Sequence, residues 1–319
     1  MTFVVLIHEP PAKRVYDDER LAELRRRVPN AQISYVENYQ QLIARLPLAH
    51  VVAGEIKEQD FLAAKQLRWI HTWAAGPDRL MYGTMRRSRV MVTCSRGNGA
   101  VPLAEHAMML MLLLNRQGVR SIHAQAEGRW DPFMHDELNG RTCGIIGLGN
   151  AGQDLALKAK AFHMRVIGVR RHPKPTPHVD QLLGPDKLDL LLEQSDVVVV
   201  ASPLTDATRG MIGLTELRRM KSSATLICFS RGGIVNESAL VRALRDGWIA
   251  GAGIDAFASE PIRPASPLWS APNLISTPHN GAWTWESARR AAAVFEDNLE
   301  RFAAGQGLRE LVDKAAGYL

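Results

Sequence analysis

Short apolar runs alternate with amphipathic stretches along the first hundred residues. The run from Phe3 to Ile7 is continuous and β-compatible, whereas the stretch from Glu19 to Arg27 has apolar positions at helical spacing. Because strands and helices alternate, we expect a parallel sheet. The pattern predicts strands at residues 3–7, 31–36, 50–53, 69–72 and 90–93, and helices at residues 19–27 and 59–66.

A second series of alternating runs begins near Thr142, and long helices at 102–117 and 285–304 precede and follow it. Six strands with helices between them are typical of a doubly wound α/β domain. The strands are predicted at residues 142–146, 166–169, 197–200, 225–229, 251–254 and 274–276, and helices at 153–162, 188–193, 215–220 and 238–246.

Gly147, Gly149 and Gly152 form a G-x-G-x-x-G motif between the first strand and the first helix of the second series. Such glycines allow a tight turn, the approach of backbone N–H groups to a pyrophosphate, and close packing of helix and strand. The phosphates of a dinucleotide then lie at the helix N-terminus. The motif alone is weak evidence, and its place between strand and helix makes it an indication of a dinucleotide site.

The residues after the next strand indicate which dinucleotide binds. An NAD site usually has an acidic residue there, about 20 residues after the glycines. This chain has no Asp or Glu between Asp154 and Asp180 and has Arg170, Arg171 and His172 at that place. Two arginines suit a ribose 2′-phosphate, so we expect NADP(H), with NAD(H) as the alternative if the arginines are only solvated.

Three polar residues each follow a predicted strand of the second series: Arg231, Glu260 and His279. Ligands of open α/β sheets bind at the carboxyl ends of the strands. Each residue alone has a simpler interpretation, as a surface arginine, a loop glutamate and a loop histidine. Together, at the edge of a predicted dinucleotide site, they form a candidate catalytic set.

Composition excludes several classes of protein. The 319 residues are 46% hydrophobic and 23% charged, which is ordinary for a globular protein, and the basic residues behind the net charge of +6 are dispersed. We therefore expect no nucleic-acid partner, while a positive field suits an anionic cofactor and acid substrates. The apolar run at 107–114 is too short to cross a membrane, and no signal peptide is evident. Three cysteines without metal-ligand spacing predict no metal and a cytoplasmic location.

Seven motifs, in order, resemble those of the D-isomer-specific 2-hydroxyacid dehydrogenase family, over nearly the whole chain. The resemblance implies two Rossmann-like doubly wound domains. A dinucleotide-binding domain at residues 102–284 is inserted into a discontinuous, flavodoxin-like substrate domain at residues 1–101 and 285–319, with the active site in the cleft. The motifs are WAAGPD at 73–78, VPLAEH at 101–106, GLGNAG at 147–152, PLTDATR at 203–209, RGG at 231–233, DAFASEP at 255–261 and TPH at 277–279.

The resemblance implies a role for each member of the catalytic set. Arg231 would bind the carboxylate and carbonyl oxygen of a 2-keto acid and polarise the carbonyl. His279 would exchange a proton with the substrate oxygen, and Glu260 would fix the histidine tautomer and favour the imidazolium. The backbone N–H groups of Ala75 and Gly76 would bind the substrate carboxylate.

The resemblance also implies the cofactor contacts, with Asp255 near the nicotinamide carboxamide and with Pro203 and Thr208 along the adenosine and pyrophosphate path. Trp283 stands in a segment after His279 that departs from the usual family sequence. It is predicted to line the substrate pocket, with a core or interface position as the alternative. The expected cofactor-binding residues are Gly147, Leu148, Gly149, Asn150, Ala151, Gly152, Arg170, Arg171, His172, Ser202, Pro203, Thr208, Phe229, Ser230, Asp255, His279 and Gly281.

Within the family, the chain looks closest to NADPH-dependent glyoxylate and hydroxypyruvate reductases, because of the arginines after the second strand. Glu260 argues against formate dehydrogenases, which have Gln there, and no regulatory domain typical of phosphoglycerate dehydrogenases follows the last helix. The family implies a homodimer through the dinucleotide-binding domain, including residues 120–139. The alternative is a corepressor-like protein of the same fold that binds dinucleotide and turns over little.

Overall fold

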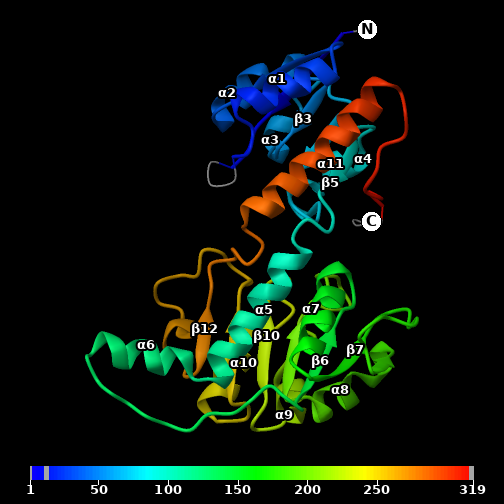
Figure 1. Cartoon of the computed structure of the whole chain (residues 1–319). Coiled ribbons are helices and arrows are strands. Elements are labelled where there is room, and N and C mark those ends of the chain that lie inside the picture. The colour runs from blue at the N-terminus through cyan, green and yellow to red at the C-terminus, as the bar shows by residue number, and fades with distance from the viewer. Residues whose placement is uncertain (1, 11–13, 316–319) are drawn as a thin grey trace. The chain divides into compact units, whose positions relative to one another are not determined.

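The computed structural model describes residues 2–10 and 14–315 (Figure 1). The chain divides into two compact units, residues 1–99 with 283–319 and residues 100–282. Each unit is built on one parallel sheet with helices on both faces, so the predicted α/β fold of two doubly wound units is confirmed.

The first unit has strand order β2-β1-β3-β4-β5, the order of flavodoxin-like sheets. Successive side chains of β1 point to opposite faces of the sheet. Leu6 packs on one face, in a core shared with side chains of β3, β4 and β5, whereas Val5 and Ile7 pack on the other face with side chains of α1 and α11. The elements are β1 (Phe3–Ile7), α1 (Asp18–Arg27), β2 (Ala31–Tyr35), α2 (Tyr39–Arg45), β3 (Val51–Ala53), α3 (Glu58–Phe61), β4 (Trp69–Thr72), α4 (Gly83–Arg87), β5 (Met91–Cys94) and α11 (Trp285–Ala303).

The second unit has strand order β12-β11-β10-β9-β6-β7-β8 with parallel pairing throughout. Helices α5 and α7 pack on one face, and α9 and α10 pack on the other. The elements are α5 (Ala100–Asn115), α6 (Gly118–Ala126), β6 (Thr142–Ile146), α7 (Asn150–Ala161), β7 (Arg165–Val169), β8 (Gln181–Leu183), α8 (Leu188–Gln194), β9 (Val197–Val200), α9 (Leu214–Arg219), β10 (Thr225–Cys228), α10 (Glu237–Arg245), β11 (Gly251–Ile254) and β12 (Leu274–Ser276).

The secondary-structure prediction was wrong at several weakly patterned elements. Strand β8 was missed because it is a three-residue edge strand whose side chains are all half-buried. Helices α2 and α6 were also missed. Each buries only one side chain, Leu42 and Ala124, so neither has a buried apolar face. The helix predicted at 59–66 ends as α3 at Phe61, and turns carry the chain from there to β4.

None of the helices in the described part of the chain has the length and apolar character needed to cross a membrane. Within residues 2–10 and 14–315, no group of three or more His, Cys, Asp or Glu side chains is placed to hold a metal ion.

Candidate active site

The turn between β6 and α7 requires glycine at two of the three motif positions. Gly147 has φ of +102°, and a Cβ there would lie 2.6 Å from the backbone nitrogen of Ser202. A Cβ at Gly152 would lie 2.1 Å from the carbonyl oxygen of Gly147. Gly149, the N-cap of α7, has no atom within 4 Å of the place of its Cβ and provides no side-chain cap. The backbone amides at the start of α7 therefore have no side-chain cap, which suits a pyrophosphate site.

The remaining residues of the motif differ in exposure. Leu148 is buried in the core, where a Cβ at Gly168 would collide with its side chain. Asn150 is exposed and Ala151 is half-buried at the first turn of α7. Any contact of Leu148 with a cofactor would therefore use its backbone.

The end of β7 presents basic side chains. Arg170 is half-buried and its Nη1 donates to Thr176 Oγ1 at 3.4 Å, while Arg171 and His172 are exposed. The nearest acidic residue that follows, Asp180, accepts from Val166 N at 2.7 Å and Lys160 Nζ at 3.0 Å. These partners hold the pKa of Asp180 below its ordinary value. The carboxylate of Asp180 is thus hydrogen-bonded to residues of β7 and α7.

Ser202, directly after β9, lies against the glycine turn. Its hydroxyl is buried and has no hydrogen-bond partner among the described residues. Such an unsatisfied buried hydroxyl at a glycine turn fits a polar group of a dinucleotide. Thr208 uses its hydroxyl within its own loop, donating to Pro203 O at 2.7 Å and accepting from Thr205 N at 2.8 Å. Thr208 thus shapes the loop that carries Pro203.

The loops that follow β10 and β11 are packed directly against each other. A Cβ at Gly232 would lie 2.0 Å from the carbonyl carbon and oxygen of Phe257, so only glycine fits there. This contact brings the loop of Arg231 beside the loop of Glu260. Arg231 Nη1 donates to Ser230 O at 2.8 Å, and the side chain is half-buried. Phe229 and Ser230 are buried.

His279 and Glu260 form a hydrogen-bonded pair. His279 Nδ1 lies 2.9 and 2.8 Å from the two carboxylate oxygens of Glu260, one of which also accepts from Phe257 N at 2.9 Å. The side chains are 41% and 34% exposed, so the pair is reached from solvent. Since Nδ1 faces Glu260, Nε2 is the ring nitrogen left for another group. Glu260 therefore fixes the orientation of the His279 ring.

The buried carboxylate of Asp255 holds the loop that carries His279. Its oxygens accept from Asn280 N at 3.1 Å and Gly281 N at 3.0 Å. A Cβ at Gly281 would lie 2.8 Å from Asp255 Oδ2, which explains the glycine. The sequence assigned Asp255 and Gly281 to the cofactor, and in the structure the Asp255 carboxylate accepts from the Gly281 amide.

Two further residues of this network were missed by sequence reasoning. Thr277 Oγ1 donates to Asp255 Oδ1 at 2.7 Å, and His106 Nε2 lies 2.9 Å from Thr277 Oγ1. Both residues stand in motifs that carried the family resemblance, at the last position of 101–106 and the first of 277–279. That position was the signal that could have identified them.

The predicted substrate residues of the first unit lie in two segments: Ala75 and Gly76 in the loop after β4, and Trp283 just before α11. Ala75 is exposed and Gly76 half-buried, and no described residue accepts a hydrogen bond from either backbone N–H. Trp283 is 50% exposed and interacts with another residue of the structure.

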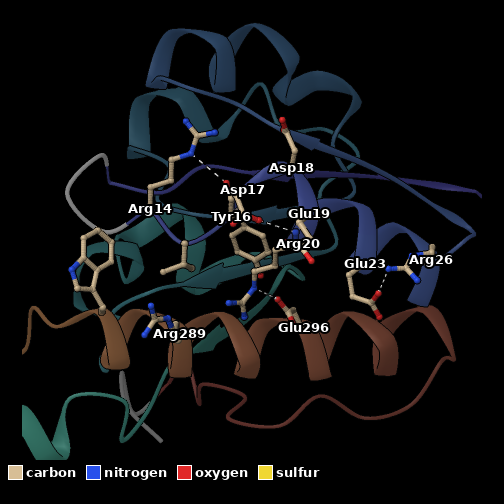
Figure 2. Close-up of a pocket in the computed structure, with 12 residues that line it drawn as sticks. Arg14, Tyr16, Asp17, Asp18, Glu19, Arg20, Glu23, Arg26, Arg289 and Glu296 are labelled. Carbon is tan, nitrogen blue, oxygen red and sulfur yellow. Dashed lines mark hydrogen bonds and ion pairs between the residues drawn. The ribbon is translucent and has the colours of Figure 1, made fainter.

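A hollow of about 1020 Å³ in the first unit contains none of the predicted site residues. It lies between α1 and the start of α11, and Figure 2 shows that charged side chains dominate it. Several of these charges pair with each other or with neighbours, as Arg20 does with Glu296 at 2.7 Å and Arg14 with Glu37 at 3.1 Å. The hollow is therefore a poor candidate for the active site.

Comparison with known proteins gives concordant matches. The family model described as D-isomer specific 2-hydroxyacid dehydrogenase, NAD binding domain, matches residues 108–281. A glyoxylate reductase of Aeropyrum pernix is 37% identical over 79% of this chain and 78% of its own length. One of Korarchaeum cryptofilum is 34% identical over 84% of this chain and 82% of its own.

Solved structures agree with these matches. A D-isomer specific 2-hydroxyacid dehydrogenase family protein from Aeromonas salmonicida has a TM-score of 0.89 at 30% identity, covering 98% of this chain and 99% of its own. An NADPH-dependent glyoxylate/hydroxypyruvate reductase from Sinorhizobium meliloti, solved with NADP and sulfate, has a TM-score of 0.82 at 26% identity, with 100% of both chains covered.

Proposed function

The chain belongs to the D-isomer specific 2-hydroxyacid dehydrogenase family, and from this premise we propose that it is an NADPH-dependent reductase of small 2-keto acids of the glyoxylate and hydroxypyruvate type. The observation that carries the proposal is the His279–Glu260 pair beside the Arg231 loop, in the unit that bears the glycine turn. Relatives named glyoxylate reductase support the substrate class.

The side chains of the second unit account for reduction of a 2-keto acid. Arg231 binds the substrate carboxylate and carbonyl oxygen and draws electron density from the carbonyl carbon. The reduced nicotinamide, when bound, supplies the hydride. His279 donates the proton on Nε2 to the substrate oxygen, giving the 2-hydroxy acid, while the hydrogen bond of Nδ1 to Glu260 orients the ring.

The residues that would hold the dinucleotide line the carboxyl edge of the sheet. The amides of Gly149, Asn150 and Ala151 at the start of α7 would bind the pyrophosphate. Ser202 would donate its unsatisfied hydroxyl. Arg170 would bind a ribose 2′-phosphate, with Arg171 and His172 adding to the positive field.

In the first unit, the N–H groups of Ala75 and Gly76 are proposed to bind the substrate carboxylate, since neither has an acceptor among the described residues. Trp283 is proposed to line the substrate side of the site. Its half-exposed ring would then limit the size of the 2-keto acid.

Initial rates with NADPH and NADH against glyoxylate, hydroxypyruvate, pyruvate and phenylpyruvate test the proposed function. We expect turnover with NADPH and the small acids to exceed every other combination. A preference for NADH would overturn the cofactor assignment alone. Dinucleotide binding without turnover on any acid would overturn the reductase proposal and favour a binding role.

Replacing Arg170 and Arg171 together by Ala should weaken NADPH binding roughly 100-fold and change NADH binding little, because charge-assisted contacts to the 2′-phosphate are lost. Fluorescence titration with both cofactors measures this. Lys174→Ala, an exposed change in the same loop, is the matched control. Equal losses for both cofactors would show that the arginines do not select the 2′-phosphate.

We propose that the protein is a homodimer through two apolar surfaces of the second unit. In Figure 1, α6 projects to one side of the second unit and the segment after it curves back to β6. This arm carries Trp130, which is 96% exposed, and Met134, which is 90% exposed. An apolar hollow of about 790 Å³ beside α5 and α7 is lined by Met109, Leu112 and Phe162 among others. Apolar patches of this kind on one unit are typical of protein interfaces.

Sedimentation equilibrium tests the dimer. Replacing Trp130 and Met134 by Glu should convert a dimer into monomers, because the apolar contact is lost and like charges are introduced on both copies. Leu62→Glu, at a 74% exposed position in the first unit, is the control. A monomeric wild type, or a double variant that remains dimeric, would contradict this interface.

A cytoplasmic location is proposed from the thiols. Cys94, Cys143 and Cys228 are free and buried, and burial raises the pKa of each. Buried free thiols suit a reducing compartment.

A further inference from the structure

Three successive carbonyl groups in the loop after β4 point to one segment at the end of β5. Asn98 Nδ2 donates to Trp73 O at 3.3 Å, and Ser95 N donates to Ala74 O at 2.9 Å. Cys94 Sγ donates to Ala75 O at 3.4 Å. The segment 94–98 therefore fixes the carbonyl side of the loop.

Segment 94–98 donates to the carbonyl groups of this loop, so the loop amides remain available to a hydrogen-bond acceptor. The N–H groups of Ala75 and Gly76 find no acceptor among the described residues. Two adjacent free N–H groups at the carboxyl edge of a parallel sheet suit a carboxylate. Since Ser95 N donates to Ala74 O, the position of Ser95 affects the geometry of this loop.

Ser95 is anchored from inside the unit by His71 of β4. His71 is fully buried, with Nε2 at 2.9 Å from Ser95 Oγ and Nδ1 at 2.8 Å from Thr93 Oγ1. Thr93 Oγ1 in turn accepts from Trp69 Nε1 at 2.8 Å. The His71 ring also contacts Phe295, with ring centroids 5.5 Å apart. No reaction step proposed above uses this histidine.

Only one proton arrangement satisfies every hydroxyl in the chain of hydrogen bonds. Burial lowers the pKa of His71 to about 3, so the ring is neutral and has one N–H. If Nε2 has the proton, Trp69 donates to Thr93, Thr93 to His71, and His71 to Ser95. Ser95 Oγ then donates to the carbonyl of Thr72 or Ala291, each at 3.5 Å. With the proton on Nδ1, the Thr93 hydroxyl would lack an acceptor.

We propose that His71 and Ser95 are positioning residues for substrate binding, which set the loop of Ala75 and Gly76 through the segment 94–98. The inference rests on the proposed function, because it assigns a substrate carboxylate to those amides. His71 is placed to act on affinity for the 2-keto acid and not on proton transfer, which belongs to His279 in the other unit.

Steady-state kinetics of Ser95→Ala test the inference. The variant removes the hydroxyl that links His71 to the loop and leaves the backbone donor in place. We expect the KM for the 2-keto acid to rise roughly 10-fold or more while kcat and the KM for the dinucleotide stay near the wild type. Ser95→Cys, which keeps the volume and offers a weak hydrogen-bond partner, should raise the same KM and serves if the alanine variant does not fold.

Tyr39→Phe is the matched control, because it removes a hydroxyl of the same unit that donates to Asp60 at 2.7 Å, outside this chain of hydrogen bonds. It should leave the KM for the 2-keto acid unchanged. Equal KM values in wild type and both Ser95 variants would overturn the inference while the proposed function stands. A parallel KM rise in Tyr39→Phe would overturn it too, as a general loss of stability. Absence of turnover in the wild type would overturn the proposed function and this inference together.

Discussion

Replacing His279 by Gln is expected to lower kcat by roughly 100-fold or more, the loss typical of removing a general acid. Glutamine keeps a polar side chain toward Glu260 and cannot deliver a proton at neutral pH. The backbone of His279 has φ of +52°, and the Asp255 hydrogen bonds to the next two amides do not involve the histidine ring. The loop should therefore persist, and dinucleotide affinity should be kept.

Stopped-flow or steady-state assays at saturating NADPH, with a fluorescence titration of the cofactor, measure this. His163→Gln is the matched control, because His163 is an exposed histidine of the same unit with φ of +56°. It should leave kcat unchanged. Near-normal turnover in His279→Gln would remove this residue from the proposed mechanism.

Replacing Arg231 by Lys is expected to lower kcat/KM for the 2-keto acid roughly 100- to 1000-fold. Lysine keeps the positive charge and loses the planar fork that binds a carboxylate and a carbonyl oxygen at once. The backbone next to Arg231 is closely packed, because Gly232 lies against the backbone of Phe257. We therefore expect the loop to keep its position in the lysine variant.

The test is a comparison of kcat/KM with the affinity for NADPH, which Arg231→Lys should leave nearly unchanged. Arg242→Lys on α10, an exposed position whose guanidinium pairs with Asp246, is the control. If Arg231→Lys kept wild-type kcat/KM, only the charge and not the bidentate contact would matter. If it lost cofactor affinity in proportion, Arg231 would belong to the dinucleotide site.

The fold and family were largely accessible from the sequence. Strongly apolar strands such as Val197–Val200 were predicted with correct bounds, because burial of a strand on both faces leaves a continuous apolar run. Elements with little burial were lost, as the half-exposed edge strand β8 shows. Seven motifs led to the family, which the comparisons confirm. The individual site residues stay predictions that the kinetic experiments decide.

The sequence by itself determined most of the elements that form and which side chains are candidates for the chemistry, because both follow from local periodicity and residue type. Only the tertiary structure decided which of these side chains meet. Three sets of contacts join residues of different strands or of the loops that follow them. These are the contact of Gly232 with Phe257, the hydrogen bonds of Asp255 to the amides of Asn280 and Gly281, and the chain of hydrogen bonds through His71. Their physical cause is strand order and close packing across the sheet, and a polar side chain buried in such a network leaves no period in the sequence.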